Sequence, residues 1–180
     1  MADFEGHLLI TLARIASIAL AVAALVPVGS ARAAAAPCVV KAFPSQGRQH
    51  VAALDPSFDY NSFPPTSGPH YPLPAAWNPY TREVPQAVLV HNLEHGGVVV
   101  QFGAAVPRTT VRKIFAWYLA DPDGIVLAPL PQLGKRIALT AWRHLATCTR
   151  FDVTAFGAFR DSYRFKGPER VPRSAMKPGQ

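Results

Sequence analysis

The stretch V-P-Q-A-V-L-V-H-N-L-E-H-G-G-V-V-V-Q-F, residues 84–102, decides how the fold is predicted, because two short apolar runs flank a polar motif. The runs 84–90 and 98–102 are rich in β-branched and apolar residues, which is typical of buried strands. The motif between them, H-N-L-E-H-G-G at 91–97, holds three titratable side chains where a plain hairpin turn would have Asn-Gly or Asp-Gly. The pattern therefore predicts two strands joined by a sharp turn with a chemical role.

The chain after this stretch predicts two helices and three further strands. One helix is expected within 107–124, because Val111, Ile114 and Tyr118 recur at helical spacing and Thr109 or Thr110 can cap it. The other is the closing helix within 152–165, with Asp152 as its cap, and the three strands lie within 125–129, 136–142 and 143–151. Since strands and helices come in runs, the predicted class is α+β with a mostly antiparallel sheet and two helices.

A long proline-rich segment, from Ala53 to Pro85, precedes these elements. Proline lacks an amide donor and restricts the residue before it, so neither a long helix nor a central strand is expected there. The segment also carries many aromatic residues, which a disordered linker would lack. We therefore expect an ordered coil that lies across a surface.

Three regions follow from composition along the chain. Residues 1–36 have the layout of a secretory signal peptide, with an apolar stretch shorter than the roughly 20 residues that span a bilayer; an uncleaved N-terminal anchor is the alternative. Residues 37–167 are expected to form one exported domain, in the cell envelope or secreted. Residues 168–180 are basic and interrupted by prolines, which predicts a disordered tail that is dispensable for folding.

The net charge of +7 bears on the partners of the protein. The basic residues are spread along the chain, and no basic helix or aromatic-basic sheet motif favours nucleic acid. The charge suggests contact of the basic tail with an anionic membrane surface or cell-envelope polymer, and the sequence names no protein partner.

Two cysteines, Cys38 and Cys148, stand near the two ends of the predicted domain. In an oxidising compartment they are expected to form a disulfide. A pair of thiolate metal ligands is the alternative.

Four histidines, His50, His70, His91 and His95, fall within one short part of the chain. His70 lies in a segment stiffened by prolines, and the last two bracket Glu94. Separate stiff loops that each present imidazoles are a common way to assemble a zinc or copper site. We therefore expect these histidines to be metal ligands, with Glu94 as a further ligand or as the acceptor that orients an imidazole.

Two other readings of the histidines remain open. H-N-L-E-H also matches the H-x-x-E-H pattern of inverzincin metallopeptidases, in which two imidazoles lie one helical turn apart and the glutamate is the general base. The predicted flanking strands argue against the helix that this hydrolase site needs. In the second alternative the chain is a structural or interaction domain whose histidines only join hydrogen-bond networks. His144, inside a predicted strand, is expected to be structural or on the surface.

Three stretches carry a resemblance to a known family: Y-N-S-F-P-P-T-S-G-P-H-Y (60–71), V-H-N-L-E-H-G-G-V-V-V-Q-F (90–102) and A-L-T-A-W-R-H-L-A-T-C-T-R-F-D (138–152). Together they resemble the bacterial domain-of-unknown-function family 3105 over roughly residues 38–168. The resemblance implies an exported or membrane-anchored bacterial domain whose pattern includes the stretches 66–70 and 91–96, and His50 matches less closely. It implies no activity. The residues themselves favour a non-catalytic protein of the cell envelope that binds copper or zinc.

Overall fold

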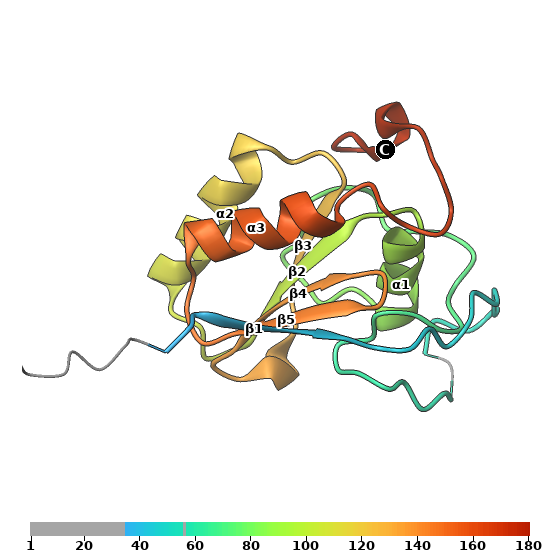
Figure 1. The fold of residues 1–180 in the computed structure, drawn as a ribbon, viewed down its shortest axis with the longest axis horizontal. Helices are drawn as coiled ribbons and strands as arrows, with labels where there is room; N and C mark the ends of the chain where they lie inside the picture. Colours follow the sequence, from blue (N-terminus) through green and yellow to red (C-terminus); the bar gives the residue numbers. More distant parts are fainter. Residues whose placement is uncertain (1–34, 56) are drawn as a thin grey trace, which may run out of the picture. The chain divides into compact units, whose positions relative to one another are not determined.

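A five-stranded sheet with helices on both faces is the frame of the protein, in a computed structural model that describes residues 35–55 and 57–180 (Figure 1). The predicted signal peptide, or uncleaved anchor, lies outside the described residues except for its last two positions. No helix in the described ranges has the length and apolar character that a membrane crossing requires. The elements are β1 (Cys38–Ala42), α1 (Gln86–Glu94), β2 (Val98–Phe102), α2 (Arg108–Ala120), β3 (Ile125–Pro129), η1 (Pro131–Leu133), β4 (Ile137–Ala141), β5 (His144–Cys148), α3 (Val153–Tyr163) and η2 (Arg173–Met176).

The strands are ordered β1-β5-β4-β2-β3. Strands β2 and β3 are parallel and are connected through α2, whereas the other three neighbouring pairs are antiparallel. The α+β class with a mostly antiparallel sheet is thereby confirmed. The described residues contain three α-helices rather than the two predicted, and the additional one is α1.

Alternation along the strands divides the core between the two faces of the sheet. Val98 and Val100 of β2 pack beneath α2 and α3, whereas Val99 between them faces α1 and the proline-rich coil. Both faces are therefore covered, as the uniformly apolar sequence of β2 requires. The first layer also contains Ile114, Trp117, Ile125, Leu127, Ile137, Leu139, Phe156 and Phe159. The second also contains Ala75, Trp77, Val84, Leu89, Leu93, Val126, Ala128 and Met176.

The predicted strand at 84–90 is wrong, because most of this run belongs to helix α1. A short apolar run cannot be assigned to strand or buried helix by periodicity alone, and α1 is buried over most of its surface. The two glycines that suggested a hairpin end the helix instead. Gly96 has a φ of +88°, and the amides of Gly96 and Gly97 donate to the carbonyls of Leu93 and Asn92. This is the hydrogen-bond pattern of a helix that stops at a left-handed glycine.

The predicted helix caps have mixed outcomes. At α3 the carboxylate of Asp152 accepts a hydrogen bond from the amide of Ala155 at 2.9 Å, which confirms the predicted cap. At α2 the N-cap residue is Pro107, without a side-chain cap, so the prediction of Thr109 or Thr110 is wrong. Pro107 donates no amide, and its fixed φ suits the entry to a helix.

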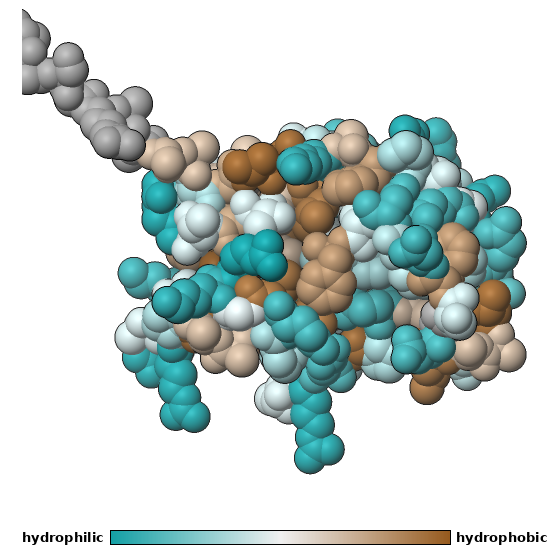
Figure 2. Space-filling model, turned by 90° about the horizontal axis from the view of Figure 1, so that it is seen from below, coloured by the Kyte–Doolittle hydropathy of each residue, from teal (hydrophilic) through white to brown (hydrophobic). Residues whose placement is uncertain are grey.

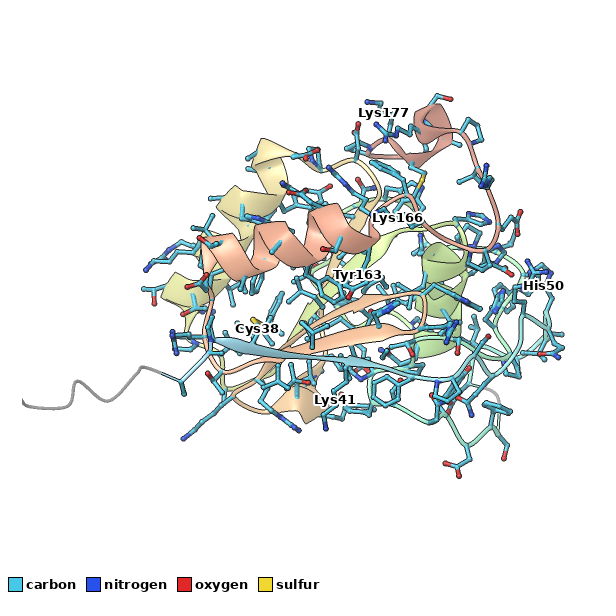
Figure 3. The ribbon with its side chains drawn as sticks, in the orientation of Figure 1. Cys38, Lys41, His50, Tyr163, Lys166 and Lys177 are labelled. Atoms are coloured by element: carbon cyan, nitrogen blue, oxygen red, sulfur yellow. A yellow bond between two sulfur atoms is a disulfide. The ribbon has the colours of Figure 1, made fainter. Side chains whose placement is uncertain are left out.

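The two cysteines form a disulfide that closes a separation of 110 residues (Figure 3 labels Cys38). Cys38 and Cys148 stand directly opposite each other in the antiparallel pair of β1 and β5. The crosslink thus fixes the edge strand β1 to the sheet. Neither sulfur is a metal ligand, so the thiolate alternative is wrong.

The C-terminal tail packs against the body, so the expectation of a disordered tail is wrong. The side chain of Met176 is completely buried in the layer that contains Trp77. The indole N–H of Trp77 donates to the carbonyl of Ala175 at 3.0 Å, and the amide of Gly124 donates to the carbonyl of Met176 at 2.7 Å. One buried methionine and several backbone hydrogen bonds hold the tail against the body, although its sequence is polar and interrupted by prolines.

Truncation after Gly167 is accordingly expected to destabilise the protein rather than leave it unchanged. The loss of Met176 from the core alone costs roughly 2–5 kcal/mol, and the hydrogen bonds to Trp77 and Gly124 are lost with it. Thermal unfolding of the truncated chain should show a melting temperature lower by about 5–15 °C. The full-length variant Met176→Ala should reproduce a large part of this decrease, and a change of only a few degrees in both would show that the tail is not docked.

Candidate metal centre

The predicted histidines converge at the C-terminal end of α1. His91 and Glu94 belong to the last turn of this helix, and His95 is its C-cap residue. His50 and His70 come from the coil between β1 and α1, where the amide of His70 donates to the carbonyl of Gln49. In Figure 3 His50 lies beside α1, at the opposite end of the sheet from Cys38.

Four side chains form what we call the inner group: His50, His70, His91 and Glu94. Each offers one ligand atom, and these atoms all lie within 4.8 Å of one another. The Nε2 atom of His70 is 2.9 Å from the Oε2 atom of Glu94, and the Nε2 atom of His50 is 3.8 Å from the same oxygen. His70 is 0%, His91 4% and Glu94 3% exposed, so three of the four members are removed from solvent.

Hydrogen bonds to backbone carbonyls fix the orientation of two rings in the inner group. The Nδ1 atom of His70 lies 2.8 Å from the carbonyl oxygen of Gly68, and that of His91 lies 2.8 Å from the carbonyl oxygen of Tyr71. A carbonyl only accepts, so Nδ1 carries the proton in both rings. In the neutral imidazoles the Nε2 atoms therefore hold lone pairs, of which that of His70 faces Glu94 Oε2 at 2.9 Å and that of His91 faces His95 Nε2 at 3.0 Å. This is the usual support for a histidine that binds a metal.

The close approach of His70 and Glu94 in the inner group requires a proton or a metal ion between the two atoms. The lone pair on Nε2 of His70 and the carboxylate of Glu94 repel each other at 2.9 Å unless a proton or a metal ion lies between them. Metal–ligand bonds of about 2.0–2.1 Å in a tetrahedron separate the ligand atoms by roughly 3.3–3.4 Å. The distances of 2.9 and 3.8 Å to Glu94 Oε2 lie on either side of that value.

The pKa values of two imidazoles favour their neutral, metal-binding form. Burial lowers the pKa of His91, although the hydrogen bond to the carbonyl of Tyr71 acts in the opposite direction. Burial also lowers the pKa of His95, against the attraction of the carboxylates of Glu169 and Glu94. Both rings are therefore mostly uncharged at neutral pH, so protons compete only weakly with a metal ion for their nitrogens.

His95 belongs to a second set of side chains rather than to the inner group. We call His91, His95 and Glu169 the outer group, and their ligand atoms also lie within 4.8 Å of one another. The Nε2 atoms of His91 and His95 are 3.0 Å apart, and the Nε2 atom of His95 is 3.7 Å from Oε1 of Glu169. The structure thus brings together four of the five predicted site residues and places the fifth in a neighbouring group that shares His91.

Glu169 and Arg48 also lie at the site, although the sequence did not predict them as site residues. Glu169 stands in the tail that was expected to be disordered, where it is the one acidic residue after Asp161. The guanidinium Nε of Arg48 is 3.7 Å from Oε1 of Glu94, with a largely exposed side chain. His144 belongs to neither group, and its ring stacks on that of Tyr163 with centroids 4.1 Å apart, in line with the expected structural role.

H-N-L-E-H lies on a helix, so the predicted flanking strands no longer argue against the metallopeptidase pattern. His91 and His95 do lie one turn apart at the end of α1, with their Nε2 atoms close together. The carboxylate of Glu94, however, contacts His70 and is buried. It is placed as a partner of an imidazole rather than as a base that faces solvent.

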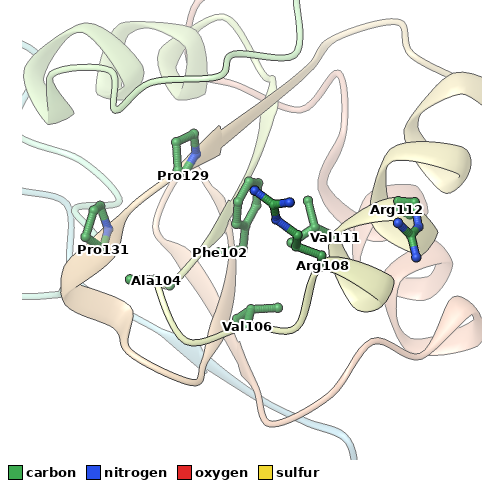
Figure 4. A pocket seen from close by; sticks show the side chains of 9 residues that line it. Phe102, Ala104, Val106, Arg108, Val111, Arg112, Pro129 and Pro131 are labelled. Atoms are coloured by element: carbon green, nitrogen blue, oxygen red, sulfur yellow. The ribbon is translucent and has the colours of Figure 1, made fainter.

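A cavity elsewhere in the molecule contains none of these residues. It has a volume of about 430 Å³ and lies between the start of α2 and the ends of β2 and β3 (Figure 4). Its walls are mainly apolar, and its charged residues are Arg108 and Arg112. The molecular face in Figure 2 shows hydrophilic and hydrophobic residues interspersed around its coloured surface. The clustered titratable groups at the end of α1 therefore remain the candidate functional site.

Comparison with protein families yields one match to the chain. The family model described as "Protein of unknown function (DUF3105)" matches residues 50–175. The matched range begins at His50 and contains every member of the inner and outer groups. No curated protein and no solved structure matches the chain.

Proposed function

Because the chain belongs to the DUF3105 family of proteins of unknown function, we propose a function from the site itself: the protein binds one divalent zinc or copper ion through the inner group. The observation that supports this most strongly is the pair of fixed imidazoles, His70 and His91. Each is buried and donates Nδ1–H to a backbone carbonyl, and the Nε2 atom of His70 lies 2.9 Å from the carboxylate of Glu94. His50 completes a set of four protein ligands.

The donor atoms favour Zn²⁺ or Cu²⁺. Imidazole nitrogens with one carboxylate suit these borderline ions, whereas Cu⁺ prefers thiolate or thioether sulfur. The two cysteines are joined to each other, and Met176 is buried in a core layer outside both groups. Sulfur ligands are thus not offered by the residues that form the centre.

A binding role is favoured over catalysis. A site with four protein ligands is closed, while a catalytic zinc keeps a position for water or substrate. A metal-dependent hydrolase with Glu94 as general base would require this carboxylate to leave the Nε2 atom of His70, 2.9 Å away. A structural domain without metal would instead hold a proton between these two side chains.

We also place the protein outside the cytoplasm. A disulfide that joins the first strand to the fifth is stable in an oxidising compartment and is rare in the reducing cytosol. The signal-peptide pattern within residues 1–36 also supports export from the cytoplasm.

Thermal unfolding with and without metal tests the proposed function. The mature chain, freed of metal with a chelator, should take up one equivalent of Zn²⁺ or Cu²⁺ at neutral pH. At a free ion concentration 100 times Kd the gain in unfolding free energy is about 2.7 kcal/mol, which raises the melting temperature by roughly 10 °C. Ca²⁺ serves as the matched control because it prefers oxygen ligands. If neither Zn²⁺ nor Cu²⁺ shifts the melting temperature, the proposal fails and the alternative of a structural domain without metal is correct.

A further inference from the structure

We propose that the outer group is an exchange port, a transient position through which the ion enters and leaves the inner group. This inference rests on the proposed function. It assigns to His95 and Glu169 a kinetic role, in which they bind the ion in transit without contributing to the final affinity. The ion keeps its charge throughout, and only its ligands change.

The shared residue His91 links the two groups and keeps them from being filled together. Its Nδ1 atom is committed to the carbonyl of Tyr71, so its Nε2 atom offers a single lone pair. That lone pair serves one ion at a time, in either the inner or the outer group. An ion that keeps its bond to His91 can therefore exchange His95 and Glu169 for His70 and Glu94.

Glu169 is held beside α1 by the backbone. We call residues 165–171 the strap. The amide of Phe165 donates to the carbonyl of Gly96 at 2.7 Å, and the amide of Glu169 donates to the carbonyl of Glu94 at 3.1 Å. A Cβ atom on Gly167 would lie 2.1 Å from the carbonyl oxygen of Glu94, so glycine is required for this close approach. The same residue that supplies a carboxylate to the inner group thus anchors the strap that carries Glu169.

The outer group opens to solvent at a cavity, whereas in the inner group the exposed member is His50 and the other three are buried. A cavity of about 460 Å³ is lined by His95, Glu169 and other strap residues. The side chain of Glu169 is 48% exposed, whereas that of Glu94 is 4% exposed. An ion reaching the molecule through this cavity meets Glu169 and His95 before it meets the buried ligands.

The charges around this cavity make the outer group a poor place for an ion to remain. Its lining includes Lys166, Arg170 and Arg173, against the single carboxylate of Glu169. These three cations disfavour a resident metal ion in the outer group, whereas the inner group has one cationic neighbour among the described residues, Arg48, and its buried Glu94 carboxylate attracts an ion more strongly. Weak binding outside and strong binding inside is the arrangement expected of an entrance.

The experiment measures Zn²⁺ exchange rather than affinity alone. Association of Zn²⁺ with the metal-free protein, and its extraction by excess fluorescent chelator, are followed in rapid mixing for wild type and Glu169→Gln. Both rates should fall together by about tenfold or more, which corresponds to a higher barrier at unchanged Kd. Glu83→Gln is the matched control, because Glu83 is exposed and its carboxylate contacts only Gln132 at 3.5 Å among the described residues.

Every other result overturns the inference. Equal rates in Glu169→Gln and wild type would show that the outer group is not on the path. A change in only one rate, with a matching change in Kd, would make Glu169 a permanent ligand. If wild type binds no Zn²⁺ at all, the proposed function itself fails, and that outcome is seen before any rate is compared.

Discussion

The variant His91→Ala is expected to lose metal binding almost completely. His91 is the one side chain that belongs to both the inner and the outer group, so its removal leaves three ligands in the inner group and two in the outer group. Loss of a group that only supports a ligand costs roughly 10–100-fold in affinity, and removal of this ligand should cost more than 100-fold. Titration with Zn²⁺, followed by calorimetry, measures the change, and the metal-dependent rise in melting temperature should disappear with it.

His144→Ala is the matched control for this substitution. The Nδ1 atom of His144 also lies 2.8 Å from a backbone carbonyl, that of Trp142, so both variants remove a ring with the same local support. His144 is a member of neither group. Its replacement should leave Kd within about threefold, less than the cost of one supporting group. Equal affinity of His91→Ala and wild type would contradict the proposed centre, and equal loss in both variants would indicate a general effect on folding.

Removal of the disulfide is expected to have the largest effect on stability. The double variant Cys38→Ser/Cys148→Ser opens a loop of 110 residues, which in the chain-entropy model lowers the free energy of unfolding by about 4–5 kcal/mol. The melting temperature should fall by roughly 10–18 °C. Chemical denaturation measures the free energy directly, and reduction of the wild type should approach the same value.

Metal affinity provides the control for the disulfide variant. Cys38 lies at the opposite end of the sheet from His50 (Figure 3), so the folded variant should bind Zn²⁺ as wild type does. Labelling of the denatured, unreduced wild type should find no free thiol. Two reactive thiols per chain, or a stability loss below about 1 kcal/mol, would be incompatible with the crosslink as the main constraint on β1.

Most of the sheet could be predicted from the sequence, because short apolar and β-branched runs between turn residues indicate its strands. The disulfide could be predicted because only two cysteines exist and both lie at the ends of the domain. Helix α1 could not, because A-V-L-V fits a strand and a helix buried on most sides equally well. The decisive signal was the pair Gly96–Gly97, which ends a helix here but equally suggests a hairpin turn.

The ligands also divide into those with a local signal and those without one. His70, His91 and Glu94 stand in stiff or compact motifs, so their type and spacing indicated a centre before any fold was known. Glu169 had no such signal. It reaches the centre only because the strap pairs with the end of α1, and that pairing depends on the absence of a side chain at Gly167.

The neighbouring positions of β1 and β5 bear on how the chain acquires its structure during synthesis. Within residues 35–55 and 57–180, β1 is at the edge of the sheet and pairs only with β5, whose last residue is made 110 residues after Cys38. A nascent chain therefore carries an unpaired first strand, including the exposed residues Val39 and Val40, until the fifth strand has emerged. Non-local pairing of this kind delays folding. A product that ends between residues 95 and 143 would retain all four inner ligands but lack both the partner of its first strand and its crosslink.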